Sequence, residues 1–591
     1  MTKKETKQDQ VNQTGLYWPG KRTEVERVIL PFQTVETVNE SKADREELAL
    51  FRQRGEPVPG WRNKLIWGDN KYIMASLLSE FAGKINLIYI DPPFATGADF
   101  SVKIKLGDLE WTKEASVIEE KAYRDTWGRG LDSYLQMMYD RLVVMRELLA
   151  ESGSILVHCD WHVAHYLKLV LDEIFRQEQF TNEIVWYYRN VGLKVKAKKF
   201  HAVTENIFWY TKGASHTYNE VFEERAEVSR QPEVEWDPVK RKTVTKKDAS
   251  GNVIYRNLID RRVQNLWDIP RIAPTSGERL NFPTQKPEML LARALTAMSD
   301  EGNLVFDPFC GSGTTGAVAE KLGRRWIMAD LSKFAIHTTR KRLLDIPDCK
   351  PFEVLNLGKY QKAKLKENGV TRYIDFILKL YRAEPISGYS TIHGKKAGRM
   401  VHIGDVDSIV TEREIRDTVQ ECATAGTKSV DFLGWDFEMG LHDLVDRIGD
   451  EHSVRIRLVQ IPREALEVRD TAREEIKFFD LNYLELEHKL KSKTLSVALK
   501  DFVISNPEYL PEEVREKVKK FTDYVDYWAV DFNYREDTFH NIWQSFRAKK
   551  HPALDTKCSH TYEDPGRYQV LVKVVDIFGN DTNKLIEVEV S

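Results

Sequence analysis

Apolar and polar residues alternate along the first half of the chain with two different periods. Short apolar runs such as Ile85 to Ile90 are typical of strands buried on both faces. Between them, apolar residues recur every three or four positions, as on one face of a helix. This succession predicts a parallel, doubly wound α/β sheet. The predicted strands span 64–67, 85–90, 154–160 and 182–188, and the predicted helices span 71–81, 132–150 and 164–175.

The alternation stops after Arg189 and resumes at Gly302. Up to about Leu280 the chain is polar, with basic patches and interleaved aromatic residues. Such a composition suits a surface that contacts phosphates and stacks on bases, and it equally suits a solvated insertion with ordinary charges. From Gly302 on, strands are predicted at 304–306 and 325–329, each followed by a helix. The candidate phosphate contacts are Lys194, Lys196, Lys198 and Lys199.

The rest of the pattern predicts two further units. Strands and helices alternate over 396–465, which predicts a small α/β domain. Alternating apolar residues near the end of the chain predict a β-rich domain over 466–591, similar to immunoglobulin-like or PKD modules. We expect a docking or DNA-clamping role for both units. The full expected division adds an N-terminal arm at 1–60 packed on the core, a sheet domain at 61–350 with an insertion at 190–280, and a linker at 351–395.

Composition and charge narrow the class of protein. The chain has 591 residues, of which 42% are hydrophobic and 30% charged, as expected for a soluble protein of several domains. The net charge of −3 gives no global basic field, so nucleic-acid contacts must come from local patches. The sequence shows no membrane-length apolar run and no signal-peptide core. Five scattered cysteines without a CxxC pair favour a reducing cytoplasm, and no metal site is expected.

The strand at 85–90 ends in the turn Asp91-Pro92-Pro93-Phe94. Two prolines fix the backbone and remove two N–H donors, so the turn must be stiff. It offers the Asp91 carboxylate and the Pro92 carbonyl as acceptors for an exocyclic amino group, and the Phe94 ring for stacking on a base. These are the needs of an enzyme that modifies the amino group of a flipped nucleobase. A tight turn with an exposed aromatic residue is the alternative interpretation.

A glycine-rich loop follows the strand at 304–306. Gly311, Gly313 and Gly316 form a GxGxxG pattern between a strand and a helix, and Asp330 ends the next strand. This geometry serves a dinucleotide or S-adenosylmethionine, and the pattern alone does not choose between them. A sheet for methyl transfer needs a donor half and an acceptor half, and here the acceptor-like turn precedes the donor-like loop. The chain therefore looks circularly permuted, with Asp69 placed near the donor's adenine.

With these motifs the chain resembles the β-class amino-methyltransferases of DNA. It is similar to the modification subunits of type III restriction–modification systems, which usually have Tyr at the position of Phe94. Three segments carry the resemblance: the Asp-Pro-Pro-Phe turn, the loop 309–315 and the segment 281–287. The insertion lies where the family keeps its target-recognition region. The resemblance implies catalytic roles for Asp91, Pro92, Pro93 and Phe94, and donor binding by Asp69, Lys286, Asp307, Phe309, Gly311, Gly313, Thr314 and Asp330.

The resemblance implies an S-adenosylmethionine-dependent methyltransferase fold and methylation of adenine N6 in double-stranded DNA. The alternatives are cytosine N4, RNA, a protein glutamine, or a catalytically silent recognition subunit. A dinucleotide oxidoreductase would leave the Asp-Pro-Pro-Phe turn unexplained. The partners expected are DNA, a restriction subunit with helicase and nuclease activity, and a second copy of the chain. A cytoplasmic location and no membrane contact complete these expectations.

Overall fold

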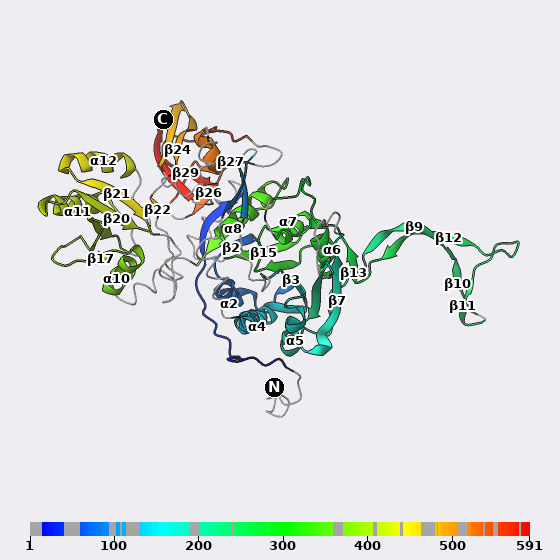
Figure 1. Cartoon of the computed structure of the whole chain (residues 1–591). Coiled ribbons are helices and arrows are strands. Elements are labelled where there is room, and N and C mark those ends of the chain that lie inside the picture. Colours follow the sequence, from blue (N-terminus) through cyan, green and yellow to red (C-terminus); the bar gives the residue numbers. More distant parts are fainter. Residues whose placement is uncertain are drawn as a thin grey trace.

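The computed structural model places the elements of the chain as drawn in Figure 1. It describes residues 15–40, 60–93, 102–106, 109–113, 130–189, 200–357 without 239, 281 and 283, 370–405, 410–461 without 436 and 438–440, 479–480, 483–504, and 518–591 without 519, 536–537, 548–552, 578 and 580. Phe94 and the four lysines between 194 and 199, for which we predicted roles, lie outside the described residues.

An eleven-stranded mixed sheet forms the centre of the molecule. The predicted α/β class is confirmed, but the sheet is not wholly parallel, because β8 runs antiparallel to both of its neighbours. In sheet order the strands are β13 (Leu266–Asp268), β7 (Phe180–Tyr187), β8 (Thr204–Thr211), β6 (Leu149–Cys159), β3 (Ile85–Ile90), β14 (Leu304–Asp307), β15 (Arg325–Asp330), β2 (Asn63–Trp67), β16 (Phe352–Asn356), β1 (Gln33–Val38) and β26 (Phe539–Asn541).

Helices cover both faces of this sheet, and each face has its own apolar core. The core on one face joins the sheet to α2 (Asn70–Phe81), α4 (Leu131–Leu148) and α5 (Ala164–Phe175). The core on the other face joins it to α6 (Glu288–Met298), α7 (Thr314–Lys321) and α8 (Lys333–Leu344). This two-sided burial explains why the strands read as continuous apolar runs. None of the helices in the described residues is long and apolar enough to cross a membrane.

Four neighbouring strands bring the predicted site residues to one edge. β3 pairs in parallel with β14, β14 with β15, and β15 with β2. Because parallel strands end at the same edge of a sheet, the acids that follow or end these strands gather there. They are Asp91 after β3, Asp307 at the end of β14, Asp330 at the end of β15 and Asp69 after β2.

The far edge of the sheet is built from segments distant in sequence. β1 comes from the predicted N-terminal arm, and β16 comes from the predicted linker at 351–395. β1 pairs antiparallel with β16 and parallel with β26, a strand of the C-terminal region. Residues 370–396 of that linker also fold, as α10 (Val370–Tyr381), β17 (Glu384–Pro385) and β18 (Gly394–Lys396). Local periodicity gives no sign of these pairings, because their partners lie hundreds of residues away.

The predicted insertion contributes two strands, β8 and β13, to the central sheet and forms a projecting arm. β8 lies inside the central sheet, whereas β9 (Phe222–Pro232) and β12 (Tyr255–Arg262) form a two-stranded antiparallel ribbon. The ribbon extends away from the body and ends in the hairpin of β10 (Val234–Asp237) and β11 (Lys242–Thr245), as Figure 1 shows. A separate hairpin joins β4 (Val102–Leu106) to β5 (Leu109–Lys113).

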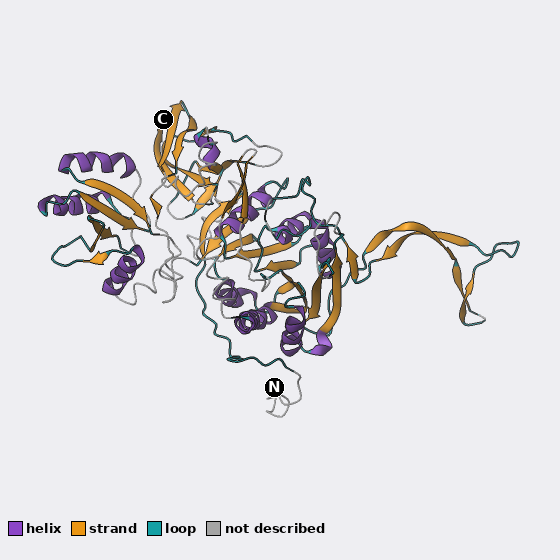
Figure 2. Ribbon diagram, in the orientation of Figure 1, coloured by secondary structure: helices purple, strands orange, loops and turns teal. Residues whose placement is uncertain are grey.

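Two further units follow the central sheet, as Figure 2 shows. The first is a six-stranded sheet of β17, β18, β19 (Arg399–Ile403), β20 (Ser429–Gly434), β21 (Arg455–Gln460) and β22 (Phe479–Asp480), packed with α10, α11 (Glu412–Thr424) and α12 (Leu441–His452). The second places two antiparallel sheets around one core: β23 (Tyr483–Lys491), β24 (Thr494–Val503) and β28 (Lys557–Thr561), and β27 (Trp543–Phe546), β25 (Val525–Asp531), β29 (Gly566–Asp576) and β30 (Asp581–Val590).

Buried ion pairs join the C-terminal sandwich to the central domain. The fully buried carboxylate of Glu36 on β1 lies 2.8 Å from both Arg340 of α8 and Lys573 of β29. Beside it, Asp526 of β25 lies 2.7 Å from His337 and 2.8 Å from Lys341, both on α8. The sandwich thus contacts the outer face of α8 through charges that are withdrawn from solvent.

Candidate active site

The Asp91 turn presents one carboxylate oxygen that no described residue satisfies. Oδ2 of Asp91 forms an ion pair with Lys286, and Oδ1 is buried without a hydrogen-bond partner among the described residues. An unbonded buried acceptor is costly unless a ligand completes it. Pro92 is buried behind it, which keeps the turn in place. Oδ1 of Asp91 is therefore placed to accept a hydrogen bond from the N–H of a substrate amino group.

The Lys286 ammonium belongs to a buried chain of polar groups. Glu205 of β8 lies 4.0 Å from Lys286 and 2.9 Å from His158, whose other ring nitrogen lies 2.8 Å from the Tyr89 hydroxyl. Burial alone would lower the pKa of Lys286, but the charges of Asp91 and Glu205 more than offset it, so its pKa is raised. Burial would raise the pKa of Glu205, yet His158 and Lys286 hold it at about 2. Lys286 therefore stays an ammonium.

The glycine-rich loop is held by Asp330 and by α8. Gly311 donates its N–H to Asp330 at 2.8 Å, and its carbonyl accepts from the Thr339 hydroxyl at 3.1 Å. Gly311 and Gly313 have φ of +51° and +72°, where a side chain is strained. A β-carbon on Gly313 would lie 2.6 Å from Thr339. Asp330 thus supports the loop, with its other oxygen accepting from the N–H of Ser332.

Asp307 is a buried acid that lines the pocket. Its two oxygens accept hydrogen bonds from the Phe309 N–H at 3.0 Å and from the Thr315 hydroxyl at 2.6 Å. Burial raises its pKa to about 7, and the hydrogen bonds from Thr315 and Phe309 only partly offset this. A cationic ligand would complete this site electrostatically, because it favours the ionised form of the acid.

A second set of contacts ties the loop to the segment that carries Lys286. The Thr314 hydroxyl donates to the Lys286 carbonyl at 3.1 Å and accepts from Arg342 at 2.8 Å. Arg342 also binds Glu288 at 2.9 Å. Sequence reasoning missed Arg342, Glu288 and Glu205, because they carry no motif and meet only in the folded chain. These contacts connect the loop directly to the Lys286 segment.

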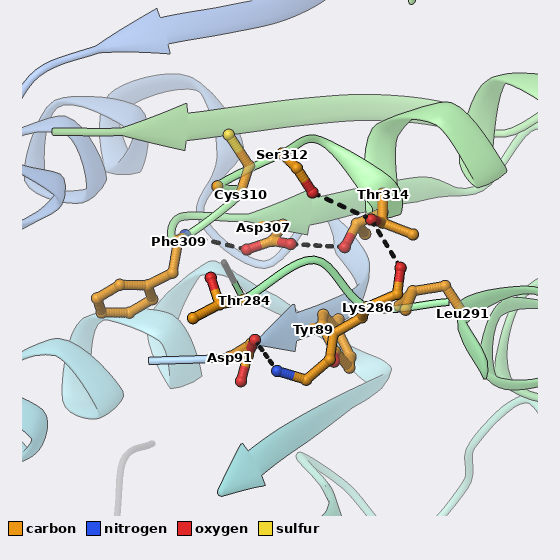
Figure 3. Close-up of a pocket in the computed structure, with 12 residues that line it drawn as sticks. Tyr89, Asp91, Thr284, Lys286, Leu291, Asp307, Phe309, Cys310, Ser312 and Thr314 are labelled. Carbon is orange, nitrogen blue, oxygen red and sulfur yellow. Dashed lines mark hydrogen bonds and ion pairs between the residues drawn. The ribbon is translucent and has the colours of Figure 1, made fainter. Parts of the chain in front are cut away.

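These residues surround a single pocket, shown in Figure 3. Of the predicted donor-binding residues, Gly313 and Asp330 support the loop from behind instead of lining the pocket. Asp69 caps α2 by accepting from the Lys71 N–H, and it pairs with Arg141 at 2.9 Å. Lys286 does line the pocket, but its ammonium contacts Asp91. The lining residues are Tyr89, Asp91, Thr284, Lys286, Leu291, Asp307, Phe309, Cys310, Gly311, Ser312, Thr314 and Thr315.

The buried side chains of His158, Cys159 and Cys310 are of types that can bind metals or act as nucleophiles, but their surroundings favour neither role. His158 belongs to the polar chain behind Lys286, and Cys159 and Cys310 are buried thiols whose pKa values are raised by burial. Among the described residues no cluster of His, Cys, Asp or Glu could hold a metal ion. A thiolate nucleophile is equally disfavoured, because burial opposes its ionisation.

The projecting arm carries the features expected of a surface that contacts nucleic acid. Trp236 and Tyr255 expose 63% and 51% of their surface, which is unusual for large aromatic residues. Exposed cations gather around the terminal hairpin, where Lys240 pairs with Asp237 and Lys246 with Glu233, both at 3.4 Å. Arginines at the base of the arm are also paired with acids, as in Arg261–Glu223 at 2.8 Å. The cations at the hairpin are Lys240, Arg241, Lys242, Lys246 and Lys247.

A glycine-rich loop, an acid on the next strand and an Asp-Pro-Pro turn on the neighbouring strand define a group-transfer enzyme with a nucleotide-like donor. The pocket fits a cationic donor, because the carboxylates of Asp91 and Asp307 line it and Oδ1 of Asp91 has no hydrogen-bond partner among the described residues. Residues 85–341 match the model of a family described as DNA methylase. The chain belongs to this family of DNA methyltransferases, which modify N6 or N4 amino groups.

Three relatives illustrate the likeness. The type II methyltransferase M.EcaI of Enterobacter cloacae is 30% identical over 47% of this chain and 69% of its own length. The DNA adenine methyltransferase YhdJ of Escherichia coli is 27% identical over 47% of this chain and 82% of its own length. The type II methyltransferase M2.DpnII of Streptococcus pneumoniae is 29% identical over 47% of this chain and 88% of its own length. The predicted likeness to type III modification subunits stays a prediction.

Solved structures also resemble parts of the chain. The M1.HpyAVI–SAM complex is 18% identical over 47% of this chain and 98% of its own, with a TM-score of 0.30. The PKD1 domain of the Vibrio cholerae metalloprotease PrtV is 12% identical over 19% of this chain and 98% of its own, with a TM-score of 0.12. The predicted PKD-like identity of the C-terminal sandwich therefore stays a prediction.

We expect Gly313→Ala to weaken binding of the methyl donor by at least about tenfold. The new methyl group would meet Thr339 at 2.6 Å and displace the loop from α8. Gly302→Ala is the matched control, because Gly302 has a φ of +77° but nothing within 4 Å of the added carbon. Backbone strain is thus similar in the two variants, at about 1 kcal/mol, and only the clash differs. Calorimetric titration measures the affinity, and equal losses in both variants would contradict this prediction.

Proposed function

We propose that this chain transfers a methyl group to the N6 amino group of adenine at specific sites in double-stranded DNA. The methyl donor is S-adenosylmethionine, the cofactor of the DNA methylase family. The observation that carries the proposal is the unbonded Oδ1 of Asp91, a residue that lines the same pocket as the glycine-rich loop. The name of the Escherichia coli relative supports adenine, and cytosine N4 is the second candidate because the family includes both targets.

The residues of the chain act mainly by positioning. Asp91 Oδ1 and the Pro92 carbonyl accept the two amino hydrogens, which directs the nitrogen lone pair out of conjugation with the ring. Lys286 forms an ion pair with Asp91 that fixes the position of the carboxylate, and Phe94 stacks on the flipped base. S-adenosylmethionine, when bound, supplies an electrophilic methyl group. Asp307, Phe309, Gly311 and Thr314 would hold the donor, and the proton released from the methylated amino group would pass to solvent.

The strand order supports a circularly permuted arrangement. β14 and β15 carry the donor loop and its acid, and β2 and β3 lie on either side of that pair although they come earlier in the chain. Read from β14, the chain would pass through the loop, Asp330, Asp69 and then the Asp91 turn. We infer that the donor half and the acceptor half have exchanged their order in the sequence while keeping their places in the sheet.

The proposal assigns DNA contact to the arm and to the basic segment 194–199. A two-stranded ribbon is narrow enough to enter the major groove, and exposed cations and aromatic rings suit phosphates and bases. We further propose a cytoplasmic location, a second copy of the chain as partner and a role in restriction–modification with a separate nuclease subunit. The names of two relatives, both type II methyltransferases, support the restriction–modification role alone.

Transfer of a labelled methyl group to DNA tests the proposed function. The purified chain is incubated with labelled S-adenosylmethionine and genomic DNA from an unmethylated host, and the DNA is digested to nucleosides. We expect N6-methyldeoxyadenosine at one short sequence context. Label in N4-methyldeoxycytidine would select the second candidate, and an absence of label in DNA would overturn the proposal.

The affinity for S-adenosylmethionine should rise with pH through about 7. In the free protein the pKa of Asp307 is about 7, so the acid is half protonated there. The cationic donor favours the carboxylate and lowers that pKa, so binding releases a proton below this pH and the affinity falls as pH falls. Asp307→Asn keeps the shape of the side chain but cannot ionise, so it should show a flat profile between pH 6 and 8. Titration calorimetry in buffers across this range measures both, and parallel profiles would contradict the assignment.

A further inference from the structure

The ammonium of Lys286 stands at the acceptor turn, and this placement gives the target base a second polar neighbour. Lys286 is 8% exposed, and its partner Asp91 is the residue whose other oxygen is unbonded. An ammonium has three N–H donors, so it can serve Asp91 and a substrate atom together. An acceptor and a donor thus lie side by side in the lining of the pocket, one following β3 and one from the segment before α6.

We propose that Lys286 donates a hydrogen bond to the ring nitrogen next to the target amino group, so that Asp91 and Lys286 together read one edge of the base. This inference rests on the proposed function and concerns how its substrate is selected. Adenine presents an amino group beside the acceptor N1, and cytosine presents one beside the acceptor N3. Guanine and thymine present a carbonyl and a ring N–H instead, which would face Asp91 and Lys286 with the wrong polarity.

Glu205 and His158 act as positioning residues in this scheme. Glu205 lies 4.0 Å from Lys286, 3.6 Å from Arg271 and 2.9 Å from His158, so it is fixed from several sides. It approaches Lys286 from β8, whereas Asp91 approaches from β3. Two carboxylates on different strands therefore hold the ammonium between them, which restricts the directions in which it can donate.

Base analogues test the contact on the unmodified protein. Duplexes carry adenine, 1-deazaadenine or 7-deazaadenine at the target position, and binding is measured with S-adenosylhomocysteine present, alongside methyl transfer. 1-Deazaadenine replaces the ring acceptor by C–H, whereas 7-deazaadenine keeps it. We expect binding and transfer to fall about tenfold to a hundredfold with 1-deazaadenine and to change little with 7-deazaadenine. Equal behaviour of adenine and 1-deazaadenine in both measurements overturns the inference.

Variants assign the effect to Lys286. Lys286→Met should bind and methylate adenine and 1-deazaadenine duplexes equally, since the donor is gone, and the double comparison isolates the contact from changes in the reactivity of the base. Glu205→Gln should keep part of the discrimination and shift the pH profile of transfer, a change that a merely structural role would not produce. Lys168→Met, which removes a lysine paired with Asp172 on α5, is the matched control and should discriminate as the wild type does.

The outcomes separate this inference from the proposed function. If Lys286→Met still discriminates against 1-deazaadenine, another group makes the contact and the inference fails while methyl transfer to adenine stands. If Lys286→Met is inactive, its relative binding of the two duplexes decides the question. If no duplex accepts a methyl group from the wild type, the proposed function fails first.

Discussion

Asp91→Ala is expected to reduce methyl transfer to DNA by at least about a hundredfold while leaving the affinity for S-adenosylmethionine close to that of the wild type. The substrate amino group loses its charged acceptor, and with it the alignment that the reaction needs. The donor loop keeps its supports, because Asp330, Thr339 and Arg342 hold it without any contact to Asp91. Labelled-methyl transfer under saturating donor, together with donor titration, measures the two quantities.

A control is needed because Asp91 is also the partner of a buried cation. Removing it leaves Lys286 with Glu205 at 4.0 Å, which partly compensates its charge. Asp91→Asn keeps the shape and one acceptor oxygen, so it should retain more transfer than Asp91→Ala and a wild-type melting temperature. Normal transfer by Asp91→Ala would show that Asp91 does not orient the amino group. Loss of donor binding in both variants would point to a collapsed site instead.

Glu36→Ala is expected to destabilise the protein by about 3–5 kcal/mol. The substitution leaves Arg340 and Lys573 as buried charges without their shared carboxylate, and burial of unpaired charge is among the most costly changes. Glu589→Ala is the matched control, because Arg567 and Glu589 form an ion pair whose side chains are 87% and 75% exposed, respectively. Its loss should cost less than about 1 kcal/mol.

Urea unfolding followed by the fluorescence of tryptophan, including the buried Trp528, measures the two variants. A shift of the midpoint for Glu36→Ala and none for Glu589→Ala is the expected result. Equal midpoints for Glu36→Ala and the wild type would mean that the two cations find other partners, or that the sandwich unfolds independently of β1. Since Glu36 lies at a junction of two units, the transition of the sandwich and that of the central sheet should both move.

The motifs and the helices of the central domain were accessible from sequence because they are local signals. A segment of about a dozen residues is enough to recognise each of three features: the apolar face of α2, the proline turn after β3 and the glycine-rich loop. The position of β8 was not accessible, since its residues 204–211 sit in a stretch whose surroundings are polar and basic. The strand is recognisable only through its antiparallel neighbours β6 and β7.

The chemistry around the motifs was equally hidden. Lys286 was predicted to bind the donor, and the structure shows its ammonium on Asp91, which is 195 positions away. Glu205 joins that pair from a third segment, and no spacing rule relates the three positions. Periodicity reports which face of an element is buried, but it carries no information on which charged side chains converge there. That information resides in the strand order, which parallel pairing fixes only after folding.

The pairing of β1 with β26 has a consequence for the synthesis of the protein. Residues 33–38 leave the ribosome long before residues 539–541, and at roughly 5–20 residues per second the interval is about half a minute or more. During that time the outer side of β1 presents unpaired backbone groups, which invite association with other chains. The nascent protein therefore passes through a stage in which its sheet is unfinished at one edge. Docking of β16 covers only the opposite side of β1, so the outer side needs protection by a chaperone until β26 arrives.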